Sequence, residues 1–111
     1  SMMNWENGKP NARFWVLKLL KNNFGPGDKL VQTHSNIPGL ATQAFITKAG
    51  RKLLLINKQQ EEIALQLPAG AKGSEMSYVD ITTGENEPAK KQLSGETIRL
   101  NAFSVAVIKF K

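Results

Sequence analysis

The carboxylates are the side chains in this sequence that could do chemistry, because two of them at the right separation act as acid and base. Asp80 is the most unusual, since it follows the apolar residue Val79 at an expected strand end and precedes the run Thr82-Thr83-Gly84. There we expect local hydrogen bonds that cap a turn rather than catalysis. The other candidates lie in or beside polar turns, which favours solvated surface groups: Asp28, Glu61, Glu62, Glu75, Glu85, Glu87 and Glu96.

The remaining catalytic and metal-binding residue types are scarce. His34 is the only histidine, and no serine lies in a Gly-x-Ser-x-Gly turn. The chain has no glycine-rich phosphate loop, and its lack of cysteine excludes disulfides and thiolate metal sites. We therefore expect no catalytic residue, no metal site and no cofactor in this chain.

A sugar-binding surface would need exposed aromatic rings with polar side chains beside them. Trp5 and Tyr78 are the only aromatic residues whose sequence context suits such a platform. Phe14 and Trp15 lie in an apolar helical pattern, which is more typical of a core. Trp5 and Tyr78 are thus the candidates for ligand binding, and the partner they would bind is a polysaccharide.

The net charge of +6 raises the question of nucleic acid binding. Binding of phosphates needs clustered basic residues, preferably with aromatic rings that stack on bases. Here the lysines are dispersed, and the only adjacent basic pairs are Arg51-Lys52 and Lys90-Lys91. No apolar run approaches the ~20 residues of a membrane-spanning helix. We expect neither a nucleic acid nor a membrane as a partner.

The elements that must position any site begin with one helix. Residues 1–9 are polar, and we interpret Ser1-Met2 as a tag remnant. Residues 10–25 predict a helix that is apolar nearly all round, so we expect burial on two sides. Pro10 suits its first turn or Asn11 its N-cap, and Gly25 followed by Pro26 predicts a left-handed C-cap.

Residues 26–111 predict short strands separated by turn residues, which is typical of an all-β protein. Residues 53–56 and 105–108 are apolar on both faces, so we expect them at the centre of a sheet that is covered on both sides. The fold class is thus an antiparallel β-sandwich of about eight strands with one N-terminal helix packed on it. The expected strands are 29–34, 40–48, 52–57, 63–67, 75–81, 90–93, 97–100 and 104–110.

Several segments resemble the trailing β domain of retaining clan-A glycoside hydrolases. Residues 11–31 resemble the junction between the catalytic barrel and this domain, and residues 51–58 resemble its central strand with the following Asn57. Residues 79–84 and the pattern Leu-x-x-Phe-Ser-Val-x-Val at 100–107 add to the match. Family 39 and the heparanase-like family 79 are the nearest families by this resemblance.

The resemblance implies a non-catalytic C-terminal domain that buttresses a (β/α)₈ barrel absent from this chain. The helix would then meet the barrel through Phe14, Trp15, Leu19 and Leu20, chiefly by the face of Trp15 and Leu19. It also implies a secreted or periplasmic protein. Two alternatives stay open, namely a carbohydrate-binding module and a stand-alone interaction domain that dimerises through the helix.

Overall fold

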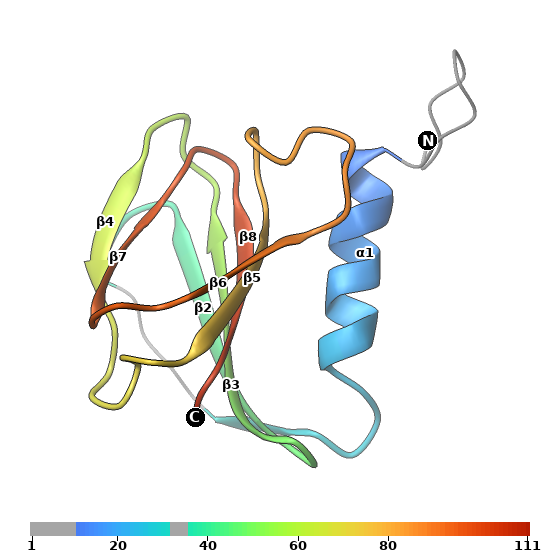
Figure 1. Ribbon diagram of the computed structural model, residues 1–111, viewed down its shortest axis with the longest axis vertical. Helices are drawn as coiled ribbons and strands as arrows, with labels where there is room; N and C mark the ends of the chain where they lie inside the picture. The colour runs from blue at the N-terminus through green and yellow to red at the C-terminus, as the bar shows by residue number, and fades with distance from the viewer. Residues whose placement is uncertain (1–10, 32–35) are drawn as a thin grey trace.

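The computed structural model describes residues 11–31 and 36–111 and shows one helix and eight strands (Figure 1). All strand pairs are antiparallel, and the strands form a six-stranded sheet and a two-stranded sheet. The helix packs on the face of the larger sheet that is opposite to the smaller one. This confirms an all-β sandwich with one packed helix. Trp5 and His34 lie outside the described residues.

Helix α1 spans Ala12–Asn23, and its first turn is capped as expected by Asn11, whose Oδ1 accepts a hydrogen bond from the Phe14 N–H at 3.2 Å. The expected left-handed cap at Gly25 is wrong. The helix ends at Asn23, its C-cap residue Phe24 is extended at φ −132°, and the first glycine with positive φ is Gly27. The extended Phe24 places its ring 4.2 Å from that of Phe45, so packing on the sheet sets this helix end.

The eight expected strands are all present, and where both ends are described each end lies within two residues of expectation. The larger sheet has the order β1-β2-β3-β8-β5-β6, and the smaller sheet pairs β4 with β7. The strands are β1 (Lys29–Val31), β2 (Leu40–Thr47), β3 (Gly50–Asn57), β4 (Ile63–Gln66), β5 (Glu75–Val79), β6 (Ala89–Gln92), β7 (Thr97–Leu100) and β8 (Val105–Lys109).

Strands β3 and β8 lie at the centre of the larger sheet, which confirms the expectation drawn from their two apolar faces. Successive side chains point to opposite faces of a strand. Leu55 and Ile108 therefore belong to the core between the two sheets, whereas Leu54 and Val107 pack beneath α1. Each central strand thus contributes side chains to both cores, between the three layers seen in Figure 1: the smaller sheet, the larger sheet and α1.

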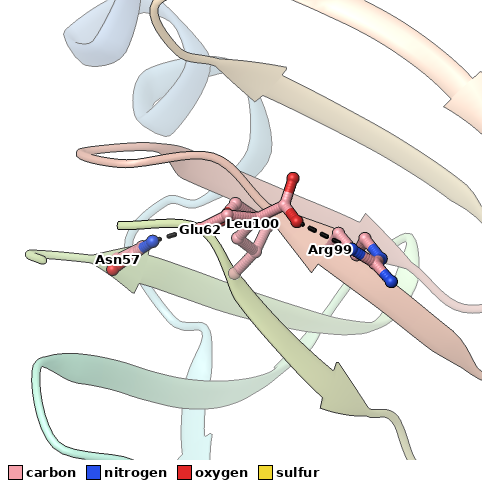
Figure 2. A network of polar contacts seen from close by, with 4 residues as sticks. All are labelled: Asn57, Glu62, Arg99 and Leu100. Carbon is pink, nitrogen blue, oxygen red and sulfur yellow. Dashed lines mark hydrogen bonds and ion pairs between the residues drawn. The ribbon is translucent and has the colours of Figure 1, made fainter. Parts of the chain in front are cut away.

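Asn57, at the end of β3, ties the two sheets together. Its Nδ2 lies 3.2 Å from the Leu100 carbonyl, 3.0 Å from that of Asn101 and 2.9 Å from that of Glu61, and donates to these oxygens. Its Oδ1 accepts from the Gln59 N–H at 2.9 Å. We call Asn57 and these partners the polar clasp. Figure 2 shows its bond to Leu100 next to the ion pair of Glu62 and Arg99 on the smaller sheet.

Candidate docking surface

An apolar groove of about 770 Å³ lies between the first turns of α1 and two loops of the sandwich. Val16 of α1 lines it together with Ile81, which follows β5, and Phe103, which precedes β8. Ile81 is 81% exposed and Phe103 is 62% exposed. Two large apolar side chains so exposed beside one groove form a surface that gains free energy when another apolar body covers it.

The turn after β5 holds Ile81 outward. The Asp80 carboxylate accepts hydrogen bonds from the Thr82 N–H at 2.8 Å and from the Thr83 N–H at 3.3 Å. The Thr83 hydroxyl in turn donates to the Asp80 carbonyl. These bonds confirm that Asp80 caps the turn, as expected from its sequence context. Because Asp80 and Thr83 are buried, the turn is anchored and the apolar side chain of Ile81 faces solvent.

Phe103 is held in an unfavourable backbone conformation. Its φ is 53°, and among the described residues it is the only one other than glycine with positive φ. The Phe103 N–H donates to the Gln59 carbonyl at 3.1 Å, which helps to fix this geometry. A large side chain in the left-handed region costs about 1–2 kcal/mol, and such strain concentrates at functional sites. In this backbone conformation the Phe103 ring lines the groove.

The structure separates the two faces of α1. Leu19 is buried against Val79 and Val107 of the larger sheet, and Trp15 packs against the same cluster. The Trp15 indole N–H also donates to the Glu85 carbonyl at 2.8 Å. The face of α1 that carries Trp15 and Leu19 thus packs on this sheet, because residues at i and i+4 share one face. The sheet covers Leu19, whereas Trp15 is only partly buried.

The other side of α1 remains open. Leu17 is 45% exposed, and its neighbours Arg13 and Lys18 are exposed as well. Phe14 and Leu20 are partly buried, and the two rings of Phe14 and Trp15 make an edge-to-face contact at 5.0 Å. Of the four residues expected at an interface, Phe14, Trp15 and Leu20 thus stay partly accessible, whereas Leu19 is buried.

Lys52 fixes the C-terminal end of α1 against β3. Its ammonium donates to the Asn23 carbonyl at 2.9 Å, where a cation complements the negative end of the helix dipole. The side chain is buried, and burial together with the nearby charge of Lys109 lowers its pKa, whereas Asp28 acts in the opposite direction. Lys52 therefore links the helix to the sheet at some electrostatic cost.

This lowered pKa predicts a pH dependence of stability. The pKa of Lys52 is lower in the folded chain than its unfolded value of 10.5. As the pH rises from the folded pKa towards 10.5, the folded chain therefore releases this proton before the unfolded chain does. The destabilisation of the folded state by the buried charge is lost over this range. We expect the free energy of unfolding of the unchanged chain, relative to Lys52→Met, to rise over this alkaline range. Urea titrations of both proteins at several pH values measure the difference. A difference in the free energy of unfolding that stays constant across this pH range would contradict the lowered pKa of Lys52. Lys48→Met, which replaces an exposed lysine, is the matched control.

Tyr78 lies on the face of β5 that points between the sheets and packs partly buried against the core. The Lys91 ammonium lies 5.6 Å from the centre of its ring. Tyr78 therefore lines a pocket between the two sheets. Sequence reasoning missed Ile81 and Phe103 as surface residues, because apolar residues in strand-like contexts are more often buried.

Comparison with solved structures finds similar folds within larger proteins. A GH30 endoxylanase from Clostridium papyrosolvens C71 has 19% identity and a TM-score of 0.69 over 96% of this chain and 29% of its own. GH30 xylanase C from Talaromyces cellulolyticus has 18% identity and a TM-score of 0.77 over 97% of this chain and 26% of its own. This chain shares its fold with a part of GH30 xylanases. It spans less than a third of their length.

A third similar structure is a conserved exported protein from Bacteroides fragilis, with 19% identity and a TM-score of 0.65 over 86% of this chain and 21% of its own. These matches agree with the resemblance to clan-A glycoside hydrolases at the level of the fold, and they do not single out family 39 or family 79. No protein-family model and no curated protein sequence matches the chain. Within residues 11–31 and 36–111, no helix has the length and apolarity to cross a membrane.

Proposed function

We propose that this chain is the non-catalytic C-terminal accessory domain of a glycoside hydrolase, whose catalytic (β/α)₈ barrel is absent from it. The observation that carries the proposal is the coverage of the structural matches. Nearly all of this chain, 96% and 97%, superposes on only 29% and 26% of two GH30 xylanases. The remaining length of such an enzyme is enough for the barrel, which typically needs about 250 residues.

The apolar groove and the open side of α1 together form what we call the docking surface, and they explain how the domain would act on the barrel. Ile81 and Phe103 are exposed on anchored loops beside α1, and Leu17 is exposed on α1 itself. Covering them would remove apolar area from water at roughly 25 cal/mol per Å², so each large side chain would contribute on the order of 1–2 kcal/mol before the cost of ordering. We propose that the barrel covers this surface and that the domain thereby stabilises it.

Phe103→Asn provides the experiment. Asparagine tolerates positive φ, so the variant relieves strain and should raise the free energy of unfolding of the isolated chain by about 0.5–1 kcal/mol. In the whole enzyme, however, the lost ring contact with the barrel should lower the melting temperature. Calorimetry of both forms tests this opposite response.

Phe103→Ala is the matched control, because it removes the ring but keeps a Cβ at positive φ. It should destabilise the whole enzyme as Phe103→Asn does, without stabilising the isolated chain. If Phe103→Asn stabilises both forms equally, the ring does not contact a barrel and the proposed docking is wrong.

We also propose that the parent protein is secreted or periplasmic, as the resemblance to clan-A glycoside hydrolases implies. The description of the Bacteroides fragilis protein as exported supports this proposal. Dimerisation through Phe14 and Trp15 is a weaker proposal, since Trp15 already bonds to Glu85 within the chain. Analytical ultracentrifugation of the unchanged chain and of Phe14→Ser tests this dimer. A dimer that forms through the helix would dissociate to the monomer in the variant.

A further inference from the structure

A small polar pocket of about 220 Å³ lies between the two sheets and is lined by residues of β5, β6 and β7 and of the segments that follow β5 and β7. Met76 and Tyr78 of β5 form its apolar side, and Lys91 of β6 reaches over the Tyr78 ring. Its volume equals that of about seven water molecules in the liquid. This suits one small ligand rather than an extended chain.

The pocket contains a buried polar atom that the fold does not use. Ser104, immediately before β8, is 1% exposed and lines the pocket. Its Oγ is the only buried side-chain polar atom among the described residues that has no hydrogen-bond partner. Buried polar atoms are almost always satisfied, so a ligand group that reached this hydroxyl would complete it.

The groups around Ser104 can both accept and donate. Asp80 Oδ1 is engaged by its own turn, whereas within residues 11–31 and 36–111 Oδ2 accepts one hydrogen bond, from the Asn101 amide at 3.1 Å. This leaves acceptor capacity at Oδ2. Lys91 offers a donor, and the Tyr78 ring offers an apolar wall. Such a mixture matches a molecule with several hydroxyl groups and an apolar carbon face.

We propose that this pocket binds a single neutral sugar unit, with one ligand hydroxyl bonded to Ser104 Oγ and another donating to Asp80 Oδ2. This binding activity goes beyond the accessory role and does not depend on it, since every residue involved lies within the sandwich. It gives Tyr78 the role of an apolar wall of this site. For about a dozen non-hydrogen atoms, ordinary ligand efficiency gives a dissociation constant of order 1 mM.

The test is a titration of the ¹⁵N-labelled 111-residue chain with D-xylose and, separately, D-glucose, followed by amide chemical shifts. At least one sugar should produce saturable shifts at Tyr78, Asn101 and Ser104. The mirror-image sugars L-xylose and L-glucose control for unspecific solvent effects. The absence of saturable shifts up to about 100 mM, some hundredfold above the expected dissociation constant, or equal shifts with both enantiomers, would overturn the proposal and leave a pocket that holds only water.

Ser104→Ala tests the assigned contact. The hydroxyl has no hydrogen-bond partner among the residues that the structure describes, so its removal should leave the melting temperature unchanged or raise it. The affinity for the sugar should nevertheless fall about fivefold to tenfold, as for one lost hydrogen bond. Ser94→Ala, at an exposed serine, should change neither quantity. Unchanged affinity in Ser104→Ala would show that the sugar, if bound, is not held as proposed.

Discussion

Asn57→Ala is expected to lower the free energy of unfolding by about 3 kcal/mol, which is a large part of the 5–15 kcal/mol typical of a domain. Asn57 is 1% exposed, and its amide donates to three carbonyl oxygens around the start of β4 and the end of β7. Alanine would leave these buried acceptors without a partner, and an unsatisfied buried polar group costs about 1–3 kcal/mol.

The same substitution should loosen the smaller sheet before the larger one. The polar clasp joins β3 to β4 and β7, whereas the larger sheet keeps its own ladder. Guanidinium titration followed by circular dichroism gives the loss of stability, and amide hydrogen exchange locates it. Asn86→Ala, at an exposed asparagine, should stay within ~0.5 kcal/mol. A loss below 1 kcal/mol for Asn57→Ala would show that the polar clasp does not hold the two sheets together.

Leu19→Ala is expected to lower the free energy of unfolding by about 3 kcal/mol as well, within the range for buried leucines. Leu19 is 3% exposed and fills the space between α1 and the larger sheet, against Val79 and Val107. Truncation removes apolar contacts from both layers and leaves a cavity, because the anchored helix cannot fully collapse onto the sheet. Urea titration measures the loss through the change in midpoint at an unchanged slope.

Leu17→Ala is the matched control on the same helix. Leu17 is 45% exposed, so in the isolated chain the substitution should change stability by less than ~0.5 kcal/mol. In the whole enzyme it should cost more, because the barrel is proposed to cover this side of α1. Equal losses for Leu17→Ala and Leu19→Ala in the isolated chain would contradict the two-faced packing of the helix.

Much of the fold could be predicted because its physical causes are local. Alternation and turn residues gave all eight strands, and two-sided apolar strands predicted β3 and β8 at the centre. The orientation of α1 was not predictable, since a helix apolar on nearly all sides does not show which side its own sheet covers. The helix end at Phe24 depends on a ring contact with Phe45, which lies far along the chain.

The candidate sites were predicted less well than the fold. Tyr78 was identified, but not the pocket around it, because Ser104, Asp80 and Lys91 meet there only after three separate strands pair. The exposure of Ile81 and Phe103 depends on the Asp80 turn and on a positive φ, and the sequence alone reveals only the turn. Both sites arise from contacts between distant segments, whereas composition and periodicity report local structure.

The central claim is that this chain is one domain of a barrel-containing glycoside hydrolase, and the gene sequence upstream of the Met3 codon tests it most directly. We predict an open reading frame that continues upstream for roughly 250 residues or more, with alternating strands and helices and glutamates at the ends of two of those strands. An in-frame stop codon shortly before Met3, with translation starting there, would contradict the account and leave the sandwich a stand-alone binding domain.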